Sequence, residues 1–264
     1  MPIINNDQLL QDVAVKFKFS DDLRKKPIIM DPFVKDFSYR FCWSSNALEG
    51  NTLSLDETVS LIDYDEVSAA HTYTEYTEAK NLYKAIQKQM IPFQEQDISA
   101  EWIKASNGLI LAEEGEYRKG AVYVGNLAEA VYYPPHYTKV PELMENYLKN
   151  TNFRSNSIRD IFETVATQHI EFERIHPFHD GNGRTGRMIL NQQLINNGLY
   201  PVTFNATGKY RQAFRIYNRN RDISSMVHIL AKAELQSIDT VKMLQHKLEK
   251  GLDYEIENSE AIEP

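Results

Sequence analysis

The sequence contains a single cysteine, Cys42, so it cannot form a disulfide within the chain or a metal site built from several cysteines. It has no long apolar run, because charged residues interrupt each hydrophobic stretch after a few positions. Its first twenty residues lack a basic start followed by an apolar segment. A disulfide-stapled scaffold is therefore excluded, and neither a signal peptide nor a membrane span is indicated. We expect a protein of the reducing cytoplasm.

The chain also lacks an excess of positive charge. It carries 29 lysines and arginines against 37 aspartates and glutamates, which gives a formal net charge of −8. Nucleic-acid binding normally needs a basic face that releases counterions, so neither a nucleic acid nor a membrane is an expected partner. No segment of twenty to fifty residues repeats, which argues against a solenoid or a propeller.

The composition is that of a folded protein, with 42% hydrophobic and 25% charged residues over 264 positions. Apolar residues recur at three- and four-residue spacing, which predicts helices over residues 32–48, 54–63, 74–89, 100–112, 140–150, 157–173, 184–197, 209–218 and 224–248. Only residues 121–124 and 130–133 are typical of strands, and Gly125-Asn126 between them favours a hairpin. The predicted fold class is all-α, a helical bundle with one small β-hairpin.

No shift in composition marks a linker, so we expect one domain in three parts. Residues 1–110 form an N-terminal helical region and residues 111–230 form the core. Residues 231–264 form a C-terminal helix and an acidic tail, which is expected to fray after Gly251.

Residues 174–187 reverse the sign of the charge, with three arginines and two histidines in fourteen positions. The segment links two predicted helices. Gly181 and Gly183 permit backbone shapes and close approaches that a side chain would prevent, and the amides that begin the following helix have no acceptor within it. Such a loop forms a nest for an anion, and phosphate is the ligand that it favours.

The side chains around this nest predict phosphoryl or nucleotidyl transfer. Arg184 and Arg187 lie three residues apart on one helix face, from which both can reach polyphosphate oxygens. Asp180 offers a hard oxygen ligand for Mg²⁺. His176 titrates near neutrality and precedes the nest, so it can take a proton from an incoming hydroxyl, while Phe178 anchors the loop.

Residues 176–187 resemble the signature loop of the Fic family, which runs His, any residue, Phe, any residue, Asp or Glu, Gly, Asn, Gly, Arg, any two residues, Arg. Every fixed position is matched. The resemblance implies a Fic-type helical bundle that binds ATP and transfers AMP to a tyrosine, threonine or serine hydroxyl of a target protein. One branch, resembling Doc, transfers the terminal phosphate and carries lysine at the position of Gly183, so the glycine favours AMP transfer. Other relatives move phosphocholine or UMP.

The resemblance also implies a role for individual residues: His176 as the general base, Asp180 as the magnesium ligand, Gly181, Asn182 and Gly183 as the phosphate nest, and Arg184 and Arg187 as contacts to the β and γ phosphates. His179 stands at a variable position, and two histidines alone lack the further ligands that a zinc site needs, so we expect it to face solvent. Asn205 and Tyr210 stand where relatives line the adenine pocket, although Tyr210 also has the helical spacing of a core residue.

Residues 45–50 resemble the inhibitory motif of the family, which runs Ser or Thr, three residues, Glu, then Gly or Asn. Ser45 and Glu49 are the matching residues, in a predicted inhibitory helix at about 33–50. As in the class with an N-terminal inhibitory helix, the motif precedes the catalytic loop. A Glu49 carboxylate paired with Arg187 would remove the cation that orients the γ phosphate, so ATP would bind unproductively. An acidic residue at a helix end is otherwise simply solvated or capping.

Residues 117–133 resemble the flap of the family, a hairpin over the active site that holds the target as an added strand. Main-chain pairing would set the register of the target while its hydroxyl reaches His176. The alternative is an ordinary exposed hairpin. Family members often form dimers, so a homodimer is a further expected partner.

Three functions are therefore open. The first is an AMP transferase that acts on an unidentified target protein and is inhibited by Glu49. The second is an enzyme that removes AMP, alone or in addition to adding it, in which Glu49 positions a water molecule. The third is a non-catalytic nucleotide-binding module, against which His176 argues, because a pure binder needs no base beside the nest.

Overall fold

A computed structural model describes residues 3–68, 70–125, 130–205 and 207–260 of the chain. Over these residues the protein is mainly helical, which confirms the all-α class. None of the described helices is long and apolar enough to cross a membrane. In chain order, the helices are α1 (Asp7–Lys18), the 3₁₀ helix η1 (Asp21–Lys25), α2 (Pro27–Glu49), α3 (Leu55–Tyr64), α4 (Tyr73–Gln89), α5 (Ala100–Leu111), the 3₁₀ helix η2 (Tyr137–Lys139), α6 (Val140–Leu148), α7 (Ile158–Ile175), α8 (Asn182–Asn196), α9 (Thr207–Asn220) and α10 (Ser224–Glu260).

Capping side chains explain where several of these helices begin. Ser54 and Thr72 each accept a hydrogen bond from the amide three residues later. Glu57 and Glu75 accept a bond from the amide of the capping residue in return, so α3 and α4 both begin with a capping box. Ser157 caps α7 through the amide three residues further along.

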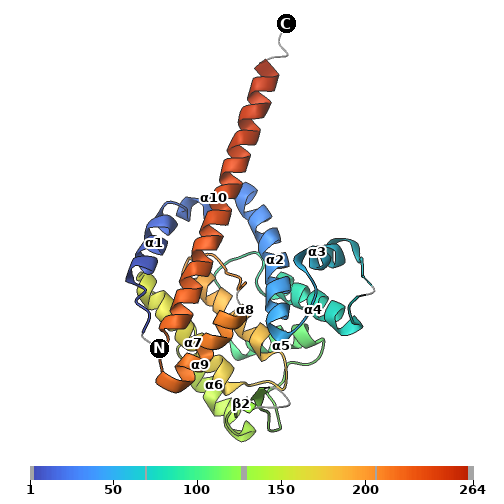
Figure 1. Cartoon of the computed structure of the whole chain (residues 1–264), viewed down its shortest axis with the longest axis vertical. Helices are drawn as coiled ribbons and strands as arrows, with labels where there is room; N and C mark the ends of the chain where they lie inside the picture. Colours follow the sequence, from blue (N-terminus) through green and yellow to red (C-terminus); the bar gives the residue numbers. More distant parts are fainter. Residues whose placement is uncertain (1–2, 69, 126–129, 206, 261–264) are drawn as a thin grey trace.

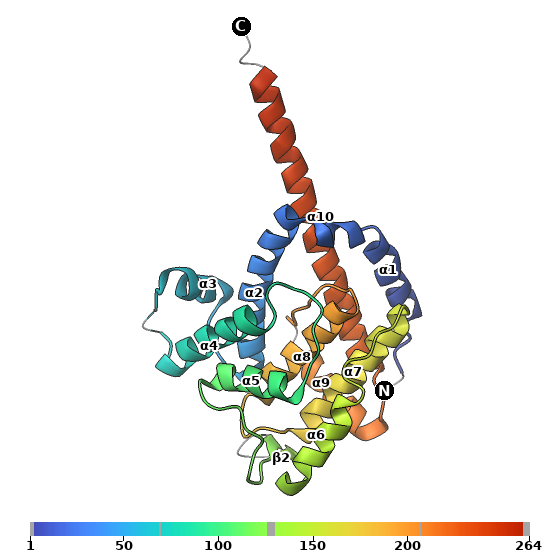
Figure 2. The same cartoon turned by 180° about the vertical axis from the view of Figure 1, so that it is seen from behind.

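Helices α2, α7 and α8 run through the middle of the molecule (Figures 1 and 2). α7 packs against α8, and α2 contacts α4, α8 and α10. Two large clusters of buried hydrophobic residues both draw on these three helices, with Phe33, Ile161 and Leu190 in one cluster and Phe41, Phe172 and Ile189 in the other. Because closely packed protein interiors deform little, the three helices form a rigid support for the loops at their ends.

The two ends of the chain differ from the prediction. Residues 7–18 form α1, which no predicted helix covered, and α1 packs on α10 with Leu10 and Val13 buried. α10 extends through Gly251 to Glu260, past the end of the predicted helix at residue 248, and its last part projects beyond the rest of the molecule (Figures 1 and 2). A single glycine costs a helix only about 1 kcal/mol, so Gly251 does not end it.

Between α5 and α6 lie two short antiparallel strands, β1 (Val124–Gly125) and β2 (Ala130–Tyr132). Val124 pairs with Tyr132. β1 begins three residues later than predicted, because a longer ladder would reach Pro134, which has no amide proton to donate. The predicted turn between the strands lies outside the described residues.

Candidate active site

The loop of residues 176–181 connects the end of α7 to the start of α8. At its first residue the backbone turns sharply, since His176 adopts a left-handed conformation with φ of 50° and ψ of 61°. For a residue other than glycine this costs on the order of 1 kcal/mol. At the other end Gly181 has φ of 72°, and a Cβ there would lie 2.8 Å from Nδ2 of Asn107. The loop geometry is therefore fixed at both ends.

Side chains from inside and outside the loop hold it against the core. Phe178 is fully buried. Its amide donates to Oδ1 of Asn182 at 2.9 Å, and its carbonyl accepts from Nδ2 of the same side chain at 3.0 Å. Asn107 of α5 donates from Nδ2 to the Asp180 carbonyl at 3.0 Å. The Asn182 side chain is thus used within the loop, which leaves its backbone amide, at the N-terminus of α8, for an anion.

The His176 ring makes one hydrogen bond to the described part of the chain, between Nδ1 and the Glu173 carbonyl at 3.3 Å. A carbonyl can only accept, so Nδ1 carries the proton and Nε2 presents the lone pair of a neutral imidazole. Burial lowers the pKa of His176 below its ordinary value, and the nearby charge of Arg118 acts in the same direction. The ring is therefore in the protonation state of a general base.

The last turns of α2 bring Ser45 and Glu49 to Arg187. The buried guanidinium donates from Nε to the Ser45 hydroxyl at 2.7 Å, and from Nη2 to the Ser45 carbonyl at 2.9 Å and to Oε1 of Glu49 at 2.6 Å. Burial opposes the charge of Arg187, but the Glu49 carboxylate outweighs it, so the pKa of Arg187 is raised. The predicted contact between Glu49 and Arg187 is present in this structure.

Gly183 lies in direct contact with this ion pair. A Cβ at Gly183 would be 2.1 Å from Oε1 of Glu49 and 3.0 Å from Nη1 of Arg187. A side chain at position 183 and an engaged Glu49 therefore exclude each other. The glycine that gives a phosphate room to approach also gives the carboxylate room to bind.

A cavity of about 510 Å³ lies beside these groups. Five of the predicted site residues line it, namely Glu49, His176, Gly183, Arg187 and Tyr210. The hairpin, α7 and α9 supply most of the remaining wall, including Val124, Tyr132, Glu173, Arg174, Arg211 and Arg215. The volume is that of a typical small-ligand site, and the arginines in the wall suit an anionic ligand.

Arg184 is not among the residues that line this cavity. Its buried guanidinium donates from Nη1 to Oε1 of Glu78, on α4, at 3.1 Å, and its Nη2 lies 3.8 Å from Oδ2 of Asp180. Oε2 of Glu78 accepts in turn from Nδ2 of Asn51 at 3.0 Å. Arg184, which the resemblance assigns to a phosphate, is thus held by a carboxylate outside the cavity.

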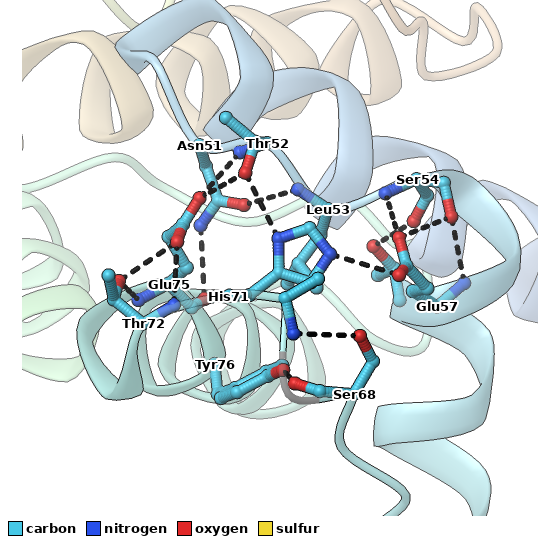
Figure 3. A network of polar contacts seen from close by, with 12 residues as sticks. Asn51, Thr52, Leu53, Ser54, Glu57, Ser68, His71, Thr72, Glu75 and Tyr76 are labelled. Atoms are coloured by element: carbon cyan, nitrogen blue, oxygen red, sulfur yellow. Dashed lines mark hydrogen bonds and ion pairs between the residues drawn. The ribbon is translucent and has the colours of Figure 1, made fainter.

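The chain that follows Glu49 is joined to α3 and α4 by a polar network (Figure 3). Thr52 donates to Oε1 of Glu75 from its amide at 2.8 Å and from its hydroxyl at 2.6 Å. The His71 ring bridges Oγ1 of Thr52 at 3.0 Å and Oε1 of Glu57 at 2.9 Å (Figure 3). These bonds fix the path of the chain from Thr52 onward, just after the end of α2.

The two residues predicted to line an adenine pocket have different environments. Tyr210 lines the cavity, but its hydroxyl is 2.5 Å from Nε2 of His169 and its ring packs against Phe204 and Phe214. Burial lowers the pKa of His169 to about 3, so this partner is neutral. Asn205 is exposed and does not line the cavity. Of the pair, only Tyr210 is placed to touch a ligand there.

Two further residues at the site, Glu173 and Arg118, had no predicted role. Glu173 lines the cavity, and its Oε1 is buried without a hydrogen bond to any described residue. Burial raises the pKa of Glu173 to about 8, so the side chain is mainly a neutral acid at pH 7. Arg118 lies outside the lining and donates to the His176 carbonyl at 2.8 Å. In the sequence Glu173 is one polar residue of an amphipathic helix, and Arg118 lies in the segment that resembles the flap, where nothing indicates a contact with His176.

The Asp180 carboxylate is suited to bind a Mg²⁺ ion that is also bound by phosphate oxygens of a nucleotide. Its side chain is 66% exposed, Oδ1 accepts from the Gly181 amide at 2.6 Å, and Oδ2 lies 3.8 Å from Nη2 of Arg184. Over the described ranges, no three His, Cys, Asp or Glu side chains group as a metal site. Mg²⁺ is commonly held by one or two carboxylates together with substrate phosphates, so Asp180 suits a nucleotide-bound ion. His179 is exposed beside Glu113, as predicted.

Comparison with known proteins reveals related sequences. The Fic/DOC family matches residues 97–194, a range that contains the loop at 176–187 and not the segment at 45–50. The protein adenylyltransferase Fic of Drosophila melanogaster is 27% identical over 215 residues, which cover 78% of this chain and 42% of that protein. Protein adenylyltransferase fic-1 of Caenorhabditis elegans is 26% identical over 215 residues, with coverage of 78% and 41%. The chain spans less than half the length of these curated relatives.

Solved structures share the fold. A Fic domain containing signaling protein from Bacteroides thetaiotaomicron has a TM-score of 0.77 at 23% identity, over 90% of this chain and 97% of that chain. Fic-1 from Caenorhabditis elegans has a TM-score of 0.73 at 23% identity, over 93% and 73%. The shared fold thus extends well beyond residues 97–194.

Proposed function

We propose that this chain, whose residues 97–194 match the Fic/DOC family, is a protein adenylyltransferase, which transfers AMP from ATP to a tyrosine, threonine or serine hydroxyl of a target protein. We also propose that Glu49 holds the enzyme in an inactive state. One observation supports both parts: His176, Gly183 and Arg187 line the same cavity, and the Glu49 carboxylate reaches into it.

His176 is suited to accept the proton of the target hydroxyl, since Nε2 carries the free lone pair. As the proton moves to Nε2, the hydroxyl oxygen bonds to the α phosphorus of ATP. The bond from that phosphorus to the oxygen that bridges to the β phosphate breaks, and pyrophosphate leaves with the electron pair. AMP remains on the target as a phosphodiester.

The N-terminus of α8 is proposed to hold the triphosphate. Its first amides favour an anion, and the guanidinium of Arg187 can bind phosphate oxygens with two parallel hydrogen bonds. Asp180 would hold Mg²⁺ through Oδ2, and the ion would neutralise charge on the phosphates. Arg184 would have to leave Glu78 before it could contribute.

Glu49 is proposed to compete with the γ phosphate for Arg187. Nη2 of Arg187 already donates to Oε1 of Glu49 at 2.6 Å, so ATP that enters while this bond persists lacks the guanidinium. The α phosphorus is then not oriented toward the acceptor. Arg211 of α9 supports the same turn, because it donates from Nη2 to the Leu48 carbonyl at 2.7 Å.

The target is proposed to bind as an added strand beside β1 and β2. Val124 and Tyr132 both line the cavity. Main-chain pairing close to these residues would bring a hydroxyl side chain toward His176 and would accept varied target sequences.

Hydrolytic removal of AMP is the second candidate, and one feature of Glu49 favours it. Its side chain is 38% exposed, and Oε2 makes no hydrogen bond to a described residue. This oxygen is therefore available to orient a water molecule toward a phosphodiester. If removal is the net activity, Glu49 is required for it and its loss abolishes it.

The test is labelling of host-cell lysate with Mg²⁺ and ATP radioactive at the α phosphate. We compare wild type, Glu49→Gly, and Glu49→Gly combined with His176→Ala, and we expect strong labelling only with the second. ATP radioactive at the γ phosphate is the control: kinases of the lysate use it too, so it should give the same background in all three samples and no band that depends on Glu49→Gly. Label that survives His176→Ala would contradict the role of the base. No label in any sample would contradict AMP transfer, and release of label from a modified target by wild type would then support removal.

A further inference from the structure

We propose that Arg118 is the positioning residue of the general base: its guanidinium holds the backbone turn that aims His176 and joins that turn to the base of the hairpin. The inference rests on the proposed function only in calling His176 the base. The contacts themselves are independent of it.

The first set of contacts is to the end of α7. Nε of Arg118 donates to the His176 carbonyl at 2.8 Å, and Nη2 lies 3.5 Å from the Ile175 carbonyl. The Arg118 amide donates to the Pro177 carbonyl at 2.8 Å. At the C-terminus of a helix the last carbonyls find no donor amide within the helix. Here three consecutive carbonyls accept hydrogen bonds from one residue, Arg118.

The second set of contacts is to the two sides of the hairpin. Nη1 of Arg118 donates to the Gly120 carbonyl at 3.0 Å, before β1, and Nη2 donates to the Pro135 carbonyl at 2.5 Å, after β2. One guanidinium therefore connects the two segments that flank the hairpin to the loop that carries His176. A target strand added to the hairpin would be joined to His176 through this residue.

The charge of Arg118 is unusual for a buried group. The residue is 5% exposed, and over the described ranges no carboxylate lies within ion-pair distance of it. Buried charges are normally paired, and a carboxylate here would be the expected partner of a purely structural arginine. Carbonyls at the negative end of the α7 dipole take that place. Among the described residues, carbonyl oxygens and no carboxylate therefore surround this positive charge next to the base.

This arrangement has two effects on His176. The left-handed backbone of His176, with φ of 50°, is held because Arg118 binds its carbonyl, and that conformation directs Nδ1 to the Glu173 carbonyl. The positive charge also opposes protonation of the ring. The charged groups that act on the ring are Arg118 from the segment after α5, Glu49 from α2 and Asp180 from the loop; the two carboxylates act in the opposite direction to Arg118.

The test uses Arg118→Gln and Arg118→Lys in the Glu49→Gly background. Arg159→Gln is the matched control, since Arg159 is an exposed arginine of α7 whose ion pairs are to Asp7 and Glu163, away from the loop. We measure AMP transfer with α-labelled ATP, the Kd for ATP by calorimetry, and the His176 ring by ¹H–¹⁵N correlation NMR against pH. The His176 signals are those that His176→Ala removes.

With Arg118→Gln we expect transfer to fall about tenfold to a hundredfold, because a misplaced base costs this much, while the Kd for ATP changes less than about twofold. The His176 titration midpoint should rise by about half a pH unit or more, and the Nδ1–H tautomer should no longer predominate over the Nε2–H tautomer. Arg159→Gln should change none of these. Arg118→Lys keeps the positive charge but loses the forked set of guanidinium donors. The His176 titration midpoint should therefore stay the same, while the rate of AMP transfer should fall in part.

A His176 midpoint and tautomer unchanged in Arg118→Gln would overturn the inference, as would an equal loss of transfer in Arg159→Gln. If Arg118→Gln does not fold, Arg118→Lys decides, because a normal rate with the fork removed also overturns it. If Glu49→Gly shows no transfer with Arg118 intact, the proposed function fails, yet the NMR comparison still tests the positioning role.

Discussion

Arg187 and Arg184 lie three residues apart on α8, and each is buried beside a carboxylate from another helix, yet the two pairs differ in place and surroundings. Arg187 lines the cavity and binds Glu49, the last residue of α2, at 2.6 Å. Arg184 lies outside the lining and binds Glu78, within α4, at 3.1 Å.

The difference shows which pair can open without rearranging the fold. A carboxylate at the end of a helix leaves through a change in the last turn, where helices fray most easily. Glu78 lies inside a helix and also accepts from Asn51, so its departure breaks a second hydrogen bond and gains nothing from the fraying of a helix end. One arginine of the signature is thus suited to regulation and the other to holding the loop.

Replacing each carboxylate in turn should give the largest difference between the two ion pairs. We expect Glu49→Gly to raise the initial rate of AMP transfer about a hundredfold, because misplaced reacting groups cost about this factor. Glu78→Gln should change the rate less than about threefold, since its pair lies outside the cavity. Rates of incorporation of α-labelled AMP measure both. Release by Glu78→Gln to the level of Glu49→Gly would remove the distinction between the pairs.

Removing the arginines is the next comparison, made in the Glu49→Gly background. Arg187→Ala should raise the Kd for ATP about tenfold or more, as expected for loss of a charge-assisted bond to phosphate. Arg184→Ala should raise it less, because Arg184 must first leave Glu78, and should instead lower the free energy of unfolding by about 1–3 kcal/mol. Calorimetry and denaturant unfolding give the two quantities, and equal effects on Kd would contradict the comparison.

Gly183→Ala sharpens the account of the Glu49 pair. In wild type the added methyl group meets Oε1 of Glu49, so the free energy of unfolding should fall by about 1–3 kcal/mol, whereas in Glu49→Gly this cost should disappear. Gly208→Ala is the control, since its Cβ meets nothing within 4 Å, and it should be neutral or stabilise by up to about 1 kcal/mol. An equal loss in both backgrounds would show that Glu49 is not what crowds position 183.

The smallest expected effect is a displaced pH profile in Glu49→Gly. A base with a lowered pKa stays neutral at lower pH, and it loses function only as the pH falls through that pKa. The acid limb of kcat/KM should therefore have its midpoint below the ordinary histidine value of about 6.5. A midpoint above that value would mean that His176 is not held neutral in the way its burial indicates.

Local periodicity predicted most of the fold. The helices from α3 to α8 begin and end within a few residues of the predicted positions, because caps such as Ser157 stand beside clear apolar spacing. The predicted helix starts at Pro32, but Pro32 lies inside α2, which begins at Pro27. α1 went unpredicted although Leu10 and Val13 have helical spacing, since its short apolar stripe is buried only by α10, at the other end of the chain.

The residues of the site likewise fall into those that local sequence predicts and those that it does not. Glu49, His176, Gly183 and Arg187 were predictable because each belongs to a motif whose spacing is local. Arg118 contacts a residue 58 positions away, and Glu78 pairs with an arginine 106 positions away. Such contacts depend on how the helices pack, and no single stretch of sequence contains that information.

Helix α2 carries Glu49 at one end and contributes Phe33 to one hydrophobic cluster and Phe41 to the other. A loss of packing that reaches the last turn of this helix would loosen the carboxylate from Arg187 before the molecule unfolds. Mild heat or a damaging core substitution such as Phe33→Ala is therefore expected to switch the enzyme on first and destroy it only later. A protein built this way would convert a weakening of its own structure into a chemical mark on another protein.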